Sequence, residues 1–264
     1  MEGVTTGRPA GAGRSLWRAW GAAVSSLALL VLAWQGLAWL AGDPRLMPPP
    51  AVVAARLLEE AGGELPFHLG VTLARVAAAF ALAMSLGSAV GIVMGRFAGL
   101  DRLAGPWLVF FLNLPALVTI VLCYIWIGLD ETAAVVAVAI NKIPNVAVTL
   151  REGARALDPR LDAMARVYGV PFGRRLRHVV LPQLYPYLAA AARSGLALVW
   201  KIVLVVELLG RPHGVGFQIA TFFRFFDVAG ILAYALAFVA VVQAIEWLLL
   251  QPLERVANRW RGST

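Results

Sequence analysis

The chain has 264 residues, 60% of which are hydrophobic, and its mean hydropathy is +0.76. Charged residues make up 14% of it, against about 25% in soluble proteins, and are too few to cover a surface exposed to water. The composition therefore excludes a soluble globular protein and a disordered chain, and the net charge of +8 is typical of a membrane protein whose basic residues meet anionic headgroups.

Six apolar stretches are long enough to cross a membrane, which takes about 20 apolar residues for roughly 30 Å of hydrocarbon. Three of them carry no charge, at residues 19–42, 76–95 and 103–129. Three more are interrupted by isolated ionisable groups, at residues 132–150, 184–210 and 228–250. We therefore predict an all-α membrane protein with six transmembrane helices. Its membrane domain is expected over residues 19–252, between terminal segments 1–18 and 253–264.

The first of these stretches follows Arg8, Arg14 and Arg18, as the apolar part of a signal peptide follows basic residues. It is longer than a signal peptide requires and no A-x-A-like cleavage site closes it. We therefore expect it to be an uncleaved first helix.

The distribution of basic residues predicts the orientation. With residues 1–18 inside, fifteen of the 23 Lys and Arg fall on the cytoplasmic side and four on the outer side, so both termini are expected in the cytoplasm. The outer segment 43–67 begins with several prolines and continues with apolar residues at helical spacing over 51–61. We expect this helix to lie on the membrane surface.

The cytoplasmic loop between the fourth and fifth spans, residues 151–181, is too long for a simple connection. Asp158 before Pro159 predicts a helix start, and Gly169 before Pro171 predicts a left-handed end and a stop. The resulting helix, residues 159–168, carries apolar residues on one face at Leu161, Met164, Ala165 and Tyr168. Because so short a helix is marginal alone, we expect it to dock onto another structure.

The same loop resembles a known family. The stretch Ala163-Met164-Ala165-x3-Gly169-x9-Val179-x-Leu181-Pro182 resembles, with matching spacing, the E-A-A-x3-G-x9-I-x-L-P loop of permease subunits of binding-protein-dependent ABC importers. Ala163 stands at the family's glutamate, with Asp162 one place earlier, and Met164 is larger than the family's usual alanine.

Further matches, over roughly residues 68–255, resemble the nitrate, sulfonate and taurine branch of these permeases. They are Thr72-Leu73-x-Arg75-Val76-x3-Phe80, Trp126-x-Gly128, Leu157-Asp158-Pro159-Arg160-Leu161, Val206-Glu207-Leu208 and Gly214-x-Gly216-Phe217. Each match alone is weak, but the ordered set on a matching span pattern is specific.

The resemblance implies a bacterial inner-membrane protein with a five-helix importer-permease core within its six spans. It implies a homodimer, a dimer of cytoplasmic ABC ATPases and a periplasmic solute-binding protein as partners. Helix 159–168 would then be a coupling helix seated in a groove of the ATPase, where Arg166 could pair with acidic residues. The implied ATPase-coupling residues are Asp158, Leu161, Asp162, Ala163, Met164, Ala165, Arg166, Tyr168, Gly169, Leu181 and Pro182.

Polar residues inside the spans are candidates for a translocation path, because a charge within the membrane is costly and usually faces the bundle interior or water. The candidates are Asn113, Asn141, Lys142, Asn145, Lys201 and Glu207. Pro144 frees backbone carbonyls beside Lys142, and the two lysines would suit an anionic solute. The alternatives are that Lys142 pairs with Glu207 or Glu246, that either lysine extends to an interface, and that Asn113 bonds across helices.

Two further features of the spans have structural interpretations. Arg75 and Arg193 lie toward span ends, where long side chains reach headgroups, and we expect them to be interface anchors rather than ligands. Gly87, Gly91 and Gly95 form a small-residue stripe at which another helix can approach closely.

The leading hypothesis is a permease subunit that moves a small anionic organic solute inward and performs no chemistry itself. No G-x4-G-K-[ST] phosphate loop occurs in the sequence, so ATP is expected to be bound by a partner and this chain needs no cofactor or metal. The alternative is a secondary transporter coupled to protons through Glu207 or Glu246, but no internal repeat favours it. An intramembrane enzyme and a nucleic-acid-binding protein lack supporting motifs.

Overall fold

A computed structural model describes residues 12–250, and in that part of the chain every regular element is helical. The helices are α1 (Ala12–Ala41), α2 (Pro50–Ala61), α3 (Leu65–Arg96), α4 (Ala98–Asn113), α5 (Ala116–Ile127), α6 (Glu131–Arg155), α7 (Pro159–Val167), α8 (Phe172–Arg175), α9 (Leu181–Gly210), α10 (Val215–Arg224) and α11 (Val228–Ile245). Two π-helical turns, Leu176–Val180 and Glu246–Leu250, precede α9 and follow α11. Most of the predicted segment 1–18 and the whole of 253–264 lie outside the described residues.

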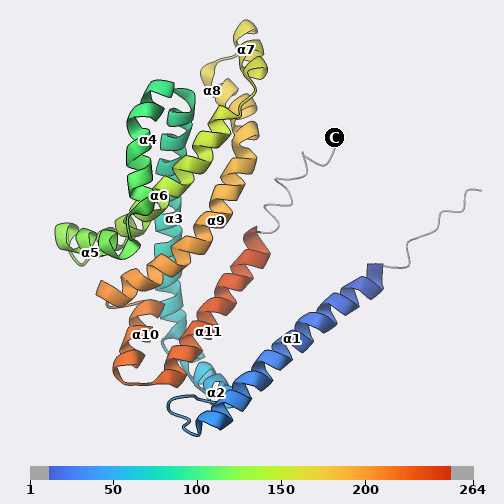
Figure 1. Ribbon diagram of the computed structural model, residues 1–264, viewed down its shortest axis with the longest axis vertical. Helices are drawn as coiled ribbons and strands as arrows, with labels where there is room; N and C mark the ends of the chain where they lie inside the picture. Colours follow the sequence, from blue (N-terminus) through green and yellow to red (C-terminus); the bar gives the residue numbers. More distant parts are fainter. Residues whose placement is uncertain (1–11, 251–264) are drawn as a thin grey trace, which may run out of the picture.

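Helices α3, α6 and α9 form the centre of the bundle (Figure 1). The helix α7 and the turn between α3 and α4 lie at one end of the molecule, and α2 and α10 lie at the other. Five of the described helical segments are long and apolar enough to span a membrane, or six if the bent pair α4 and α5 counts as one span. The predicted all-α membrane fold is confirmed.

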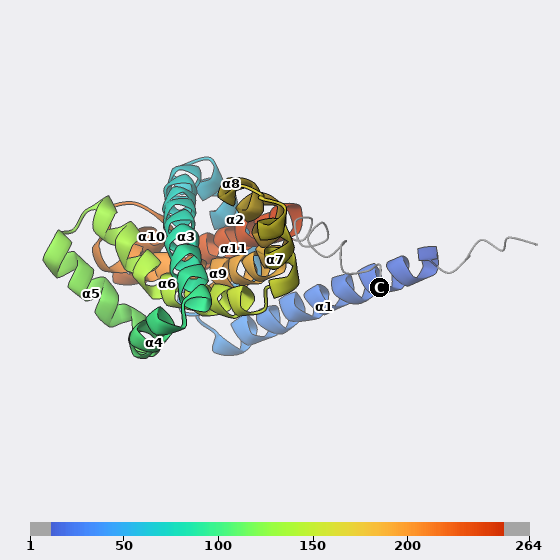
Figure 2. The same cartoon turned by 90° about the horizontal axis from the view of Figure 1, so that it is seen from above.

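Helix α1 leaves the bundle and runs alone, as Figures 1 and 2 both show. It is joined to the rest near its end, where the indole N–H of Trp34 donates to the carbonyl oxygen of Pro48 at 3.1 Å. The predicted helix 51–61 is α2, whose Val53 is buried. Its place on the membrane surface stays a prediction.

The third predicted span, 103–129, is not one continuous helix. The structure divides it into α4 and α5, which are bent by 98° relative to each other. The cause is Pro115, which disfavours helical geometry at the residue before it; Leu114 is accordingly extended, with φ −72° and ψ 123°. The sequence analysis did not anticipate this bend because the span was judged by its apolar length alone.

The stripe of small residues on α3 packs against α6, as predicted. A Cβ atom at Gly87 would lie 2.6 Å from the Cβ of Val146, and one at Gly95 would lie 2.5 Å from the carbonyl oxygen of Arg151. A Cβ at Gly91 would overlap the carbonyl oxygen of Ala147. Backbone therefore meets backbone along this contact, which only glycine allows.

Candidate functional site

The helix α7 forms where its caps predict it. The Asp158 carboxylate accepts from the backbone N–H of Arg160 at 2.8 Å. At the other end Gly169 has a φ of +61°, and the N–H of Val170 donates to the carbonyl of Ala165 at 2.9 Å. These bonds close both ends of a helix of nine residues. The predicted helix 159–168 is confirmed, and it ends one residue early at Val167.

Helix α7 lies at the tip of the molecule (Figure 1), and most of its apolar face is uncovered. Ala165 is buried, but Met164 is 50% exposed and Tyr168 79% exposed, and Leu161 is exposed too. Ala163, Arg166 and Pro182 are also exposed, and the side chain of Asp162 lies outside the described part. Within residues 12–250, most of the predicted apolar face of α7 is therefore left without a covering surface.

The base of α7 is attached firmly to two long helices. The backbone N–H of Asp158 donates to the side-chain oxygen of Gln183, in the first turn of α9, at 2.9 Å. A small core joins the end of α6 to the start of α9, made of Leu150, Ala154, Leu184 and Ala191 with Leu157 packed against it. These contacts join the base of α7 to α6 and α9.

A cluster of charges fastens α4 to the same base. Asp101, in the first turn of α4, accepts from Arg151 at 3.4 Å and from Arg155, both in the last turns of α6. Glu152 pairs with both arginines, at 3.0 and 3.2 Å. Helix α4, the first half of the bent pair, is thereby joined to the segment that carries α7.

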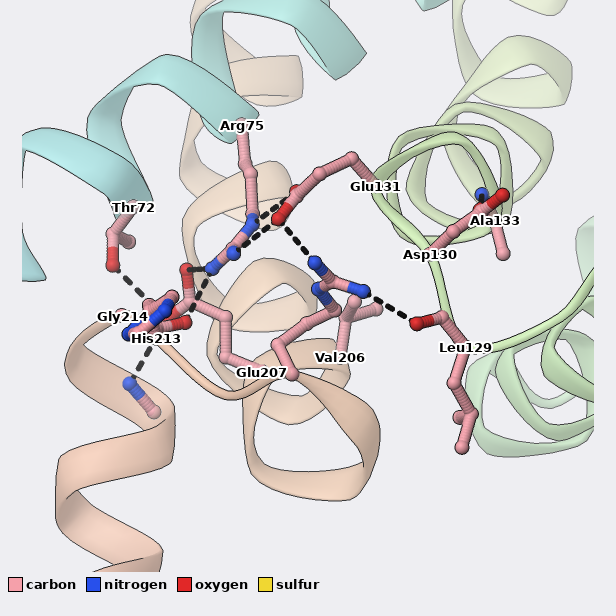
Figure 3. A network of polar contacts seen from close by, with 12 residues as sticks. Thr72, Arg75, Leu129, Asp130, Glu131, Ala133, Val206, Glu207, His213 and Gly214 are labelled. Carbon is pink, nitrogen blue, oxygen red and sulfur yellow. Dashed lines mark hydrogen bonds and ion pairs between the residues drawn. The ribbon is translucent and has the colours of Figure 1, made fainter.

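A network of charged residues lies at the opposite end, around the buried Arg75 (Figure 3). The Arg75 guanidinium donates to both carboxylate oxygens of Glu131, each at 2.7 Å, and to Glu207 at 2.7 Å. It also donates to the carbonyl oxygen of His213 at 2.6 Å. One side chain of α3 thus holds the start of α6, the end of α9 and the connection to α10.

Glu207 is fully buried, with an exposed fraction of 0%, and all its partners are hydrogen-bond donors. Besides Arg75, the hydroxyl of Thr72 and the backbone N–H of Gly216 donate to it, both at 2.9 Å. A Cβ atom at Gly214, where φ is +119°, would overlap the Glu207 carboxylate. The close approach of this loop to the carboxylate therefore requires glycine.

Two more groups complete the network. Arg211 pairs with Glu131 and donates to the carbonyl of Leu129 at 2.7 Å. The ring nitrogen Nδ1 of His68 accepts from the backbone N–H of Gly214 at 2.9 Å. Two arginines face two carboxylates here, so the charges of the network balance, and the buried Arg75 and Glu207 are paired with each other.

The structure corrects two interpretations of the spans. Arg75 is no interface anchor, since it is 5% exposed and its guanidinium is bound inside the protein. Lys142 does not pair with either expected carboxylate, because Glu207 is held by Arg75 and Glu246 pairs with Arg193 at 3.7 Å. The sequence reasoning judged Arg75 by its position near the end of its own span, whereas its carboxylate partners lie more than 50 residues away along the chain.

The predicted path residues do not meet in one cluster. Asn113, Asn141 and Asn145 each donate to the carbonyl four residues earlier in the same helix, at 2.8, 2.9 and 3.5 Å. Asn113 therefore does not bond across helices. Lys201 lies on an exposed face of α9. Lys142, on α6, is buried against Gly195 of α9. The two lysines thus occupy different surroundings.

Sequence reasoning missed the role of Glu131 and Arg211, which no local pattern marked. A signal for the rest of the network existed nevertheless, because the short matches to the permease family contain Thr72, Arg75, Glu207, Gly214 and Gly216. The structure brings these five residues into one network.

Comparisons with known proteins agree with this geometry. The family model described as "Binding-protein-dependent transport system inner membrane component" matches residues 68–250. The chain is 28% identical to the putative aliphatic sulfonates transport permease protein SsuC of Bacillus subtilis (strain 168), over 89% of this chain and 86% of that protein. It is 27% identical to the taurine transport system permease protein TauC of Escherichia coli (strain K12), over 90% of this chain and 89% of that protein.

A solved structure has the same fold. The crystal structure of an amino acid ABC transporter with histidines matches with a TM-score of 0.60 and 20% sequence identity. The match covers 75% of this chain and 96% of that chain.

Proposed function

The chain belongs to the family of binding-protein-dependent transport system inner membrane components, and from this membership we propose that it carries a small anionic organic solute, such as a sulfonate, into the cell. Relatives named for aliphatic sulfonates and for taurine support the solute class. The proposed partners are a second copy of this chain, a cytoplasmic ABC ATPase dimer and a periplasmic solute-binding protein. ATP is bound by the ATPase, and the permease supplies the path.

The observation that carries the proposal is the uncovered apolar face of α7. A capped helix that protrudes from the molecule with Met164 and Tyr168 exposed is suited to a groove in another protein, because apolar side chains gain by burial. Its attachment to α6, α9 and, through Asp101, α4 provides a route by which movement of an ATPase reaches the spans.

Charge supports the orientation in which α7 is cytoplasmic. The end of the molecule that carries α7 also carries more of the described basic residues than the opposite end, among them Arg151, Arg155 and the run Arg174–Arg175. The opposite end carries Arg45, Arg56, Arg211 and Arg224. This asymmetry favours cytoplasmic termini by the positive-inside rule, and it places the Arg75 network near the outer end of the bundle.

A matched pair of glycine variants tests the proposal. We expect Gly169→Val to weaken co-purification with the cognate ATPase, and to lower solute-stimulated ATP hydrolysis, by roughly 5- to 30-fold, since a side chain at φ +61° costs about 1–2 kcal/mol. Gly173→Val is the control, because nothing lies within 4 Å of a Cβ at that position. Both variants are measured in membranes that co-express the ATPase.

Two results would contradict the proposal. One is a wild-type chain that does not co-purify with the ATPase. The other is proton-driven uptake by the chain alone in vesicles, which would establish the secondary transporter instead.

A further inference from the structure

Lys142 is a buried cation in the centre of the bundle. It lies near the middle of α6 and is 1% exposed. A Cβ atom at Gly195 of α9 would lie 2.7 Å from the Cε of Lys142, 3.5 Å from its Nζ and 3.4 Å from the ring of Phe80 in α3. The lysine side chain therefore occupies the space that Gly195 leaves open between α6 and α9.

Among the described residues, Lys142 has no counter-ion. In the part of the chain that the structure describes, no hydrogen bond or ion pair joins Lys142 to another residue. The acidic residues of the spans are engaged elsewhere: Glu131 with Arg75 and Arg211, Glu207 with Arg75, and Glu246 with Arg193. Lys142 thus differs from Arg75, whose burial is compensated by carboxylates on two other helices.

An unpaired polar group in this position lowers the stability of the folded protein. Burying an ammonium without a partner is costly, and a methionine of similar length would fill the same space without that cost. Residues that break such a rule inside an otherwise consistent core are expected at functional sites.

Two irregular positions lie beside Lys142 in the contact between α6 and α9. Gly195 contributes no side chain where the lysine lies, and Pro144 interrupts the hydrogen-bond ladder of α6 two residues beyond the lysine. Asn145, one turn from Lys142, is partly exposed and donates only a long bond of 3.5 Å within its own helix. The same two helices carry α7 at their joined ends.

We propose that Lys142 is the residue that selects anions in this permease: it is closed off between α6 and α9 in the present conformation and faces the solute path when those helices part. The inference rests on the proposed function, since movement of α7 is what parts them. The ligand class is a small organic anion, whose negative charge supplies the counter-ion that the protein lacks.

Thiol labelling measures this charge without requiring knowledge of the solute. In the transporter assembled with its ATPase and binding protein, Cys123→Ala removes the buried native thiol and Asn145→Cys introduces one beside Lys142. Labelling by an anionic reagent, sulfonatoethyl methanethiosulfonate, is compared with labelling by a cationic one, trimethylammonioethyl methanethiosulfonate. The rates are measured during ATP hydrolysis and without ATP, in chains that retain Lys142 and in chains with Lys142→Met or Lys142→Gln.

We expect the ratio of anionic to cationic labelling during ATP hydrolysis to be about tenfold higher, or more, when Lys142 is present, because residues three apart on a helix lie about 5–6 Å apart. The control is Thr149→Cys, on the same side of α6 as Asn145 but two turns from Lys142, where the ratio should change far less. An equal ratio in both backgrounds would overturn the inference even if the complex hydrolyses ATP. Failure of the wild-type complex to assemble would instead refute the proposed function.

A stability measurement separates a selecting residue from a structural one. We expect Lys142→Met to raise the melting temperature of the complex, because an unpaired polar group leaves the core. Lys201→Met, which removes an exposed lysine from α9, should not raise it. A lower melting temperature for Lys142→Met would show that the lysine holds the helices together, and would overturn the inference.

Discussion

Arg75→Met should destabilise the protein by about 3–5 kcal/mol, the usual cost of removing one partner from a buried ion pair. The variant leaves Glu207, whose exposed fraction is 0%, without its cation, and it releases Glu131 and the carbonyl of His213. Thermal unfolding of the purified protein in detergent measures the loss.

Two companion variants make this result specific. Arg75→Met combined with Glu207→Gln removes the stranded charge, so the double variant should be more stable than Arg75→Met alone. Arg224→Met removes an exposed arginine at the end of α10 and should change stability by less than about 0.5 kcal/mol. Equal melting temperatures for Arg75→Met and Arg224→Met would refute the claim that this network holds α3, α6 and α9 together.

Gly91→Leu should prevent α3 and α6 from packing. Even the first carbon of a side chain at this position would overlap the backbone carbonyl oxygen of Ala147, and it would lie 3.0 Å from the Cα of that residue. Because backbone cannot move aside as a flexible side chain can, we expect a loss of about 3 kcal/mol or more. Yield of folded protein and unfolding temperature both report it.

Gly70→Leu is the control for this effect, since it lies on the same helix with nothing within 4 Å of a Cβ. Replacing a helical glycine in open space removes its entropic cost, so this variant should gain about 0.5–1 kcal/mol. The two leucine variants of α3 are therefore expected to change stability in opposite directions. A stable Gly91→Leu variant would contradict the close packing of the two helices.

Helix α7 shows how far local sequence reasoning extends. Asp158, Pro159 and Gly169 act within a few residues of one another, and their bonds form as their types predict. The bend at Pro115 was equally local and was missed only because the span was read for length. Both features depend on the backbone preferences of single residues.

The Arg75 network could not be predicted from local sequence patterns. Its carboxylate partners lie 56 and 132 residues away along the chain, and nothing near Arg75 distinguishes a buried ion pair from a headgroup anchor. The alternative in which Lys142 pairs with Glu207 or Glu246 fails for the same reason, because both carboxylates are bound to other cations.

Helix positions, caps and the charge asymmetry of the two ends follow from residue types and their spacing, because burial in lipid and backbone preference act over a few residues at a time. Ion pairs depend instead on tertiary packing, because the helix faces that pack together decide which charges lie close to one another. Only the packing of α3, α6 and α9 shows that Arg75 is compensated and that Lys142 is not.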